Sequence, residues 1–179
     1  MNDDLDKYIE YAIRNGATNA KQIQPGSVVT APWVRLKCQY GCSGFGSSFC
    51  CPPNTPTPEE TRKILDSYKR AVLFHLELPR MQGRGKRFDD FVAMLTDLEG
   101  EIFKDGYYKA FVFLAGPCTL CKECSKLTNS LCNFGERARP AMEACGIDVF
   151  QTVRNNGFFI QTLRDKSETR NLYCLMLVD

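Results

Sequence analysis

The stretch Phe111-Val-Phe-Leu-Ala-Gly-Pro-Cys-Thr-Leu-Cys-Lys-Glu-Cys124 joins an apolar run to three cysteines, each three residues from the next. With the residues before it, the run 108–115 predicts a buried β-strand. Gly116 and Pro117 turn the chain at the end of this strand. The cysteines therefore follow a strand end, which is where α/β folds usually hold ligands. This stretch predicts an α/β fold that presents a thiol-rich loop.

Cysteines are unusually frequent, with ten in 179 residues. Eight of them form two clusters: Cys38, Cys42, Cys50 and Cys51 in the first, and Cys118, Cys121, Cys124 and Cys132 in the second. A chain of this length with 44% hydrophobic residues can bury a core without disulfides. We therefore expect the clustered thiols to be metal ligands or redox groups rather than structural crosslinks.

The start of the chain supports this expectation. Residues 1–6 are acidic, with neither the basic nor the apolar region of a secretory signal. No apolar run approaches the length of a transmembrane helix. We expect a cytoplasmic protein in which thiols stay reduced, and disulfides remain the alternative if a signal peptide has been removed.

The pattern along the chain predicts a single domain over residues 1–179, an α/β sandwich of two or three layers with a mixed sheet. The clearest helix start is Thr57-Pro58-Glu59-Glu60, because Thr57 and Glu60 can form a capping box. Pro32 is expected to interrupt an extended region. We expect helices over 5–13, 57–69, 88–102 and 136–144, and extended segments over 28–30, 33–36, 71–78, 108–115, 147–153, 158–163 and 172–178.

The second cluster is typical of an iron–sulfur site. Three cysteines at every third residue, with a fourth further on, resemble the run that wraps a [4Fe–4S] cluster in bacterial ferredoxins. The likeness is partial, because Cys132 follows after seven intervening residues and no proline comes after it. Zinc ribbons instead use two separated pairs of cysteines. Iron–sulfur clusters are therefore the expected cofactor, with zinc as the alternative.

The first cluster is less regular and lies in a glycine-rich loop expected from Cys38 to Thr55. Cys50 and Cys51 are adjacent, and adjacent side chains on an extended chain point apart. Cys51 precedes a proline, which favours an extended backbone at that residue. We expect Cys51 to be a ligand, and Cys50 to be a packed or spare thiol that is only a tentative ligand.

Two longer motifs resemble those of a known family. They are Cys38…Cys42-x-x-Phe-Gly-x-x-x-x-Cys51-Pro-Pro53, and Gly116-Pro-Cys118-x-x-Cys121-x-x-Cys124 followed by Cys132 and by Arg139-Pro-x-Met-Glu-Ala-x-Gly-Ile-Asp-Val149. The chain resembles the predicted metal-binding proteins of domain of unknown function 2284, from about Lys37 onward. The resemblance implies metal binding and implies no reaction or substrate.

The resemblance carries over to seven cysteines as metal and cofactor ligands: Cys38, Cys42, Cys51, Cys118, Cys121, Cys124 and Cys132. Two cubane clusters ligated only by cysteine would need eight thiolates, which Cys50 would complete. The only histidine, His75, lies in an apolar strand and is expected to be a core residue with a partner. Cys145 and Cys174 are expected in the core. One cluster shared by both loops, or a second cluster with an open iron, remain alternatives.

Two charged segments complete the pattern. Arg139 and Glu143 are four residues apart, so a helix over 136–144 would place them on one face, either paired with each other or with a loop carbonyl, or orienting the cysteine loop. Arg80, Arg84, Lys86 and Arg87 are expected in a solvated loop, with a docking patch for an acidic partner or a phosphate as the alternative.

Three functions remain open: electron transfer or redox accessory work, an enzyme with an open iron acting as a Lewis acid, and a structural zinc protein or metal carrier. A redox partner protein fits the first. A net charge of +2 gives no electrostatic case for nucleic acid or a membrane. With one histidine and no phosphate-binding loop, hydrolase triads, kinase chemistry and NAD chemistry have no support. Catalytic residues and oligomeric state are not indicated by the sequence.

Overall fold

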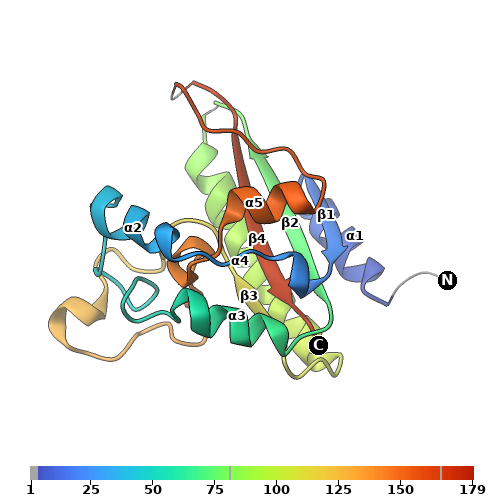
Figure 1. Ribbon diagram of the computed structural model, residues 1–179, viewed down its shortest axis with the longest axis horizontal. Helices are drawn as coiled ribbons and strands as arrows, with labels where there is room; N and C mark the ends of the chain where they lie inside the picture. The colour runs from blue at the N-terminus through green and yellow to red at the C-terminus, as the bar shows by residue number, and fades with distance from the viewer. Residues whose placement is uncertain (1–3, 81, 166) are drawn as a thin grey trace.

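The computed structural model describes residues 4–80, 82–165 and 167–179, so part of the acidic start lies outside it. It confirms an α/β sandwich, with a four-stranded sheet in the order β1-β2-β4-β3 between two layers of helices (Figure 1). The strands are β1 (Asn19–Ile23), β2 (Ala71–Leu78), β3 (Phe111–Phe113) and β4 (Arg170–Leu177). All three ladders are antiparallel, so the sheet is antiparallel and not mixed as expected. The one parallel pairing among the described residues is an isolated bridge between Leu114 and Ala141, outside the strands.

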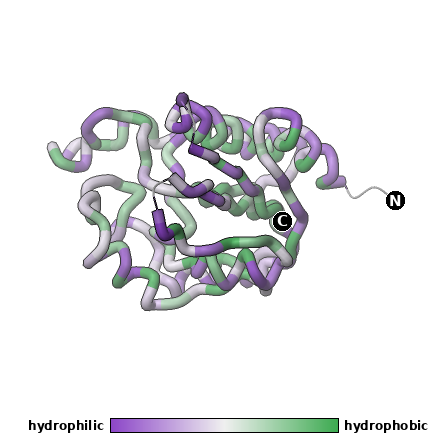
Figure 2. Tube along the Cα trace, turned by 90° about the horizontal axis from the view of Figure 1, so that it is seen from above, coloured by the Kyte–Doolittle hydropathy of each residue, from purple (hydrophilic) through white to green (hydrophobic). Residues whose placement is uncertain are grey.

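The two faces of the sheet pack against different helices. Alternate side chains of β2, such as Phe74 and Leu73, point to opposite faces. Phe74 joins a core with α1 (Asp6–Arg14) and α4 (Arg84–Lys104), while Leu73 joins a second core with α3 (Pro58–Asp66) and α5 (Val149–Asn155). β2 is therefore nearly continuously buried, as its apolar sequence predicted. Figure 2 shows the hydrophobic stretches gathered around the strand that ends at the C-terminus.

The elements predicted from strong local signals are confirmed. β2 spans the predicted residues 71–78. In α3, the Thr57 side chain accepts a hydrogen bond from the Glu60 N–H while the Glu60 carboxylate accepts one from the Thr57 N–H. The helix ends at Asp66, three residues before the predicted end. α4 begins at Arg84, before the predicted start, so part of the expected basic loop is its first turn.

The prediction of an extended segment at 33–36 was wrong. Residues Pro32–Gly41 form α2, with Ala31 as the N-cap and Pro32 at its first position. Proline suits this position because the first N–H groups of a helix have no partner within the helix. Cys38 therefore lies on a helix, and the cysteine loop begins only after Gly41.

The predictions for residues 136–153 were also wrong. The expected helix over 136–144 is a series of turns that ends in the short 3₁₀-helix η3 (Glu143–Cys145). Pro140 lies in the middle of the expected helix, where it would remove a backbone hydrogen bond. The strand expected over 147–153 is mostly α5, which begins where the Asp148 side chain accepts a hydrogen bond from the Gln151 N–H.

Two further differences concern the edges of the sheet. Residues 158–163 have no regular structure, although a strand was expected there. β1 was not predicted, because its sequence Asn-Ala-Lys-Gln-Ile contains few of the β-branched and aromatic residues typical of strands. The predicted strand 108–115 is reduced to the three residues of β3.

Two other 3₁₀-helices, η1 (Pro25–Ser27) and η2 (Ser125–Thr128), lie in loops. No helix among the described residues has the length and apolar character needed to cross a membrane.

One buried ion pair ties the return from the second cysteine loop to the rest of the fold. The Arg139 guanidinium donates through Nε and Nη2 to the Glu99 carboxylate of α4, at 2.6–3.0 Å. Glu99 Oε2 also accepts a hydrogen bond of 2.7 Å from the Val112 N–H of β3. The side chains are only 16% and 10% exposed. The expected pairing of Arg139 with Glu143 along a helix was therefore wrong, because Glu99 binds Arg139.

We predict that Arg139→Met lowers the free energy of unfolding by about 3 kcal/mol, because it leaves the buried Glu99 carboxylate without its counter-charge. Arg137→Met is the matched control, since Arg137 pairs with Asp97 of the same helix but both side chains are largely exposed. Its loss should stay below about 1 kcal/mol. Urea unfolding of the two variants measures both values, and equal losses would contradict a special role for the Arg139–Glu99 pair.

Candidate metal centre

The two cysteine segments lie side by side at the end of the molecule remote from the N-terminus (Figure 1). The first comprises the end of α2 and the loop to Pro53, and the second is the loop after β3. Lys126 Nζ of the second segment donates a hydrogen bond of 2.9 Å to the Gly46 carbonyl of the first. The clusters, which are far apart in the sequence, are therefore neighbours in space.

Three thiols of the first segment form one group, which we name the first thiol group: Cys38, Cys42 and Cys51. Burial raises the pKa of Cys38, and the charges of Glu143, Cys42 and Cys51 contribute to the shift, so these side chains are near each other. Cys51 Sγ accepts a hydrogen bond of 3.2 Å from the Ser48 hydroxyl and lies 3.6 Å from the Gly44 carbonyl oxygen.

The four cysteines of the second segment form the second thiol group: Cys118, Cys121, Cys124 and Cys132. Desolvation raises the pKa of Cys121, followed by the charges of the other three members. All four are partly buried. The charges of the four cysteines therefore act on one another, which places them in one neighbourhood of the loop.

Cys50 contacts the second thiol group rather than the first. Its side chain is buried and donates a hydrogen bond to the Cys118 sulfur. This bond lowers the pKa of Cys118 to about 6 and raises the pKa of Cys50. Cys51 is bound instead to Ser48 and Gly44, so the two adjacent cysteines have different surroundings, as expected. The Cys50–Cys118 contact joins the two loops sulfur to sulfur.

The donor atoms fit a metal that prefers soft ligands. Thiolates select zinc, copper(I) and iron–sulfur clusters over hard cations such as magnesium. None of the ten cysteines forms a disulfide. Across residues 4–80, 82–165 and 167–179, no three cysteine, histidine or carboxylate side chains converge on one metal position.

The remaining candidate ligands lie elsewhere, as the sequence predicted. Cys145 and Cys174 are fully buried in the two cores. Burial raises the pKa of Cys145 to about 12, which keeps this thiol protonated and unreactive. His75 lies within 2.8 Å of the Asn171 side-chain oxygen and stacks on Tyr173. His75 therefore has the expected partner, but it is only partly buried and belongs to neither core, so its expected place in the core was wrong.

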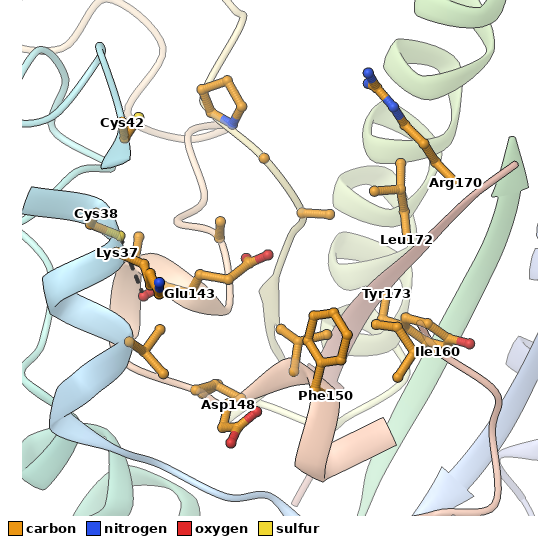
Figure 3. A pocket seen from close by; sticks show the side chains of 18 of the residues that line it. Lys37, Cys38, Cys42, Glu143, Asp148, Phe150, Ile160, Arg170, Leu172 and Tyr173 are labelled. Carbon is orange, nitrogen blue, oxygen red and sulfur yellow. Dashed lines mark hydrogen bonds between the residues drawn. The ribbon is translucent and has the colours of Figure 1, made fainter. Parts of the chain in front are cut away.

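A cavity of about 640 Å³ opens beside the first thiol group. Cys38, Cys42 and Cys51 line one side of it, together with Cys50. The opposite side is formed by α5 and β4, as Figure 3 shows with Phe150, Tyr173 and Leu172. The cavity therefore lies between the cysteine loop and the face of the sheet that packs against α5.

Glu143 is the acidic side chain directed into this cavity (Figure 3). Its carboxylate is accessible from the cavity, but the surrounding protein atoms desolvate it and raise its pKa above the usual range. The backbone carbonyl of Glu143 lies 3.9 Å from Cys38 Sγ. Glu143 therefore connects the cavity to the first thiol group.

Two threonines hold the turn that carries Glu143, and sequence analysis did not identify them. Thr55 Oγ1 donates to the Ala144 carbonyl at 2.5 Å, and Thr61 Oγ1 donates to the Cys145 carbonyl at 2.7 Å. The sequence analysis also did not identify Glu99 as a functional residue, although its position in the sequence indicates a buried charge. It falls within the helical stripe of Leu95, Leu98 and Ile102, where a charged residue needs a partner.

One comparison with known proteins gives a match. The sequence model of the family described as "Predicted metal-binding protein (DUF2284)" matches residues 21–178, which is most of the chain. No curated protein and no solved structure matches the chain. The matched range includes both thiol groups and the cavity.

We predict that Cys50 sets the reactivity of Cys118 in the metal-free, reduced protein. Because the Cys50 S–H stabilises the Cys118 thiolate, alkylation of Cys118 by iodoacetamide should rise with pH around a midpoint near 6. In Cys50→Ala this midpoint should move up by more than one pH unit, toward the ordinary value for a thiol. Peptide mass spectrometry follows the modification, with Cys174→Ala as the control. An unchanged midpoint in Cys50→Ala would contradict the contact.

Proposed function

This chain belongs to the DUF2284 family of predicted metal-binding proteins, and we propose that its metal is iron, held in one or two [4Fe–4S] clusters by the cysteines of the two thiol groups. The observation that supports this most is the approach of the two loops. Eight thiols on two neighbouring segments exceed the four ligands that one zinc ion takes. The loops bring four cysteines to one group and three to the other, with Cys50 between them.

We further propose electron transfer or redox accessory work as the role of these clusters. A bound iron–sulfur cluster supplies one-electron transfer. The protein supplies partial burial of the sulfurs, and Phe45 lies beside the first thiol group in the cavity wall. Solvent exposure and hydrogen bonds to the sulfurs tune such centres, so Ser48, which donates to Cys51, is a tuning residue in this proposal.

Docking of a redox partner protein is supported by apolar side chains exposed around the loops. Tyr40 near the end of α2, and Leu127 and Leu131 in the second loop, are 79%, 55% and 88% exposed. Exposed apolar groups that gather near a functional site are typical of interaction surfaces. A partner bound there would lie close to the thiol groups, which short-range electron transfer requires.

An enzyme with an open iron is the second candidate, favoured by one specific observation. The thiol group with three members, rather than four, is the group that lines the cavity. Three thiolates leave one iron of a cubane without a cysteine ligand, and such an iron supplies Lewis acidity. In this case the cavity walls would orient the substrate against the first thiol group.

We predict that protein purified without oxygen is brown and contains iron and acid-labile sulfide in nearly equal amounts. A total near four irons per chain indicates one cluster, and near eight indicates two. Cys118→Ala and Cys38→Ala should each lower the iron content, whereas Cys174→Ala should retain it, because Cys174 is a core residue. Colourless protein with stoichiometric zinc would contradict the iron–sulfur proposal.

The open-iron candidate has its own test. We predict that cyanide changes the EPR spectrum of the reduced protein, because a small anion can bind an iron that lacks a cysteine ligand. An unchanged spectrum in protein with a full complement of iron would contradict the open site and leave electron transfer as the supported role.

A further inference from the structure

We propose that the cavity beside the first thiol group is a binding site for a small organic cation, in which an apolar or aromatic body packs in the cavity and a protonated amine pairs with Glu143. The volume of about 640 Å³ is within the range of roughly 300–1,000 Å³ typical of small-molecule sites. The site shares one wall with the proposed metal centre, because Cys38, Cys42 and Cys51 line the cavity, and the test therefore includes metal-free protein.

The walls select for an apolar, ring-bearing ligand. Four aromatic residues line the cavity: Trp33 from α2, Phe45 from the cysteine loop, Phe150 from α5 and Tyr173 from β4. Most of the other lining residues are aliphatic or small, such as Ile147 and Leu172. Aromatic faces also attract organic cations through their negative π-surface. The same walls therefore favour both the body and the charge of the proposed ligand.

Glu143 supplies the charge that the ligand would meet. Its carboxylate points into the cavity (Figure 3) and forms no ion pair within the described parts of the chain. The hydrogen bonds from Thr55 and Thr61 fix the backbone of the turn that carries Glu143. A protonated amine bound in the cavity would provide the counter-charge for this carboxylate.

The other charged residues of the cavity do not replace the ligand. Asp148 is engaged as the N-cap of α5, where it accepts a hydrogen bond from the Gln151 N–H. Arg170 lies at the far edge of the cavity from Glu143 (Figure 3). Lys37 lines the same side as Glu143 (Figure 3), and the two form no ion pair in the part of the chain that the structure describes. Glu143 is therefore the acidic group best placed to select a cation.

Three probes with the same aromatic body test the charge preference: 2-phenylethylamine, 2-phenylethanol and phenylacetate. Each is titrated by calorimetry into the full-length protein purified without oxygen. We expect the amine to bind at least ten times more tightly than the alcohol or the carboxylate. Glu143→Gln should remove this preference, while Glu59→Gln, an exposed change on α3, should retain it.

The position of the bound amine has an independent readout, because Trp33 is the only tryptophan of the chain and lines the cavity. In metal-free full-length protein, the amine should change the Trp33 emission with the same dissociation constant that calorimetry gives for that sample. The proposal would be overturned if no probe binds, if the alcohol or carboxylate binds as well as the amine, or if Glu143→Gln keeps the preference. Those results would leave the iron and sulfide content, and so the metal proposal, unchanged.

Discussion

The bidentate ion pair between Arg139 and Glu99 is the interaction on which the rest of the site depends. Glu99 is held in the buried stripe of α4 and also binds the backbone of β3, so the pair joins a helix, a strand and the chain returning from the second cysteine loop. Just beyond it, Leu114 and Met142 continue the connection through backbone hydrogen bonds. The loop with the second thiol group is therefore closed at both ends by the core of the sandwich.

The same segment organises the first thiol group and the cavity. After Pro140 the chain forms the turn at η3, whose carbonyls bind Thr55, Thr61 and Cys38. The backbone at Gly146 has a positive φ of 76° and lies against Pro58, so a larger residue there would collide with the start of α3. Both cysteine loops thus attach to one short, rigid segment. Their sulfurs meet at Cys50 and Cys118.

The sequence predicted correctly those helices and strands whose formation depends on interactions between residues close together in the chain. The capping box of Thr57 and Glu60 identified α3, and the apolar run 71–78 identified the central strand. Proline was ambiguous, because Pro32 can end a strand or begin a helix, and only tertiary packing made it begin α2. Asp148 capped α5 within a segment whose apolar residues favoured a strand.

The candidate site was predictable in composition but not in arrangement. Spacing alone separated the cysteines of the two groups from Cys145 and Cys174, which the structure places in the core. The contact of Cys50 with Cys118, the partner of Arg139 and the cavity around Glu143 all join residues distant in sequence. Such contacts leave no periodic pattern, except where a charged residue such as Glu99 interrupts an apolar stripe.

The protein combines a sandwich core with two thiol loops, one of which borders the cavity around Glu143. We propose that these loops bind iron–sulfur clusters. Mössbauer spectroscopy of protein produced with ⁵⁷Fe and purified without oxygen tests this claim most directly, because it identifies the type of iron centre. We predict the spectrum of the delocalised iron pairs of a [4Fe–4S] cluster. A spectrum of isolated iron coordinated by four thiolates, or no protein-bound iron, would contradict the account.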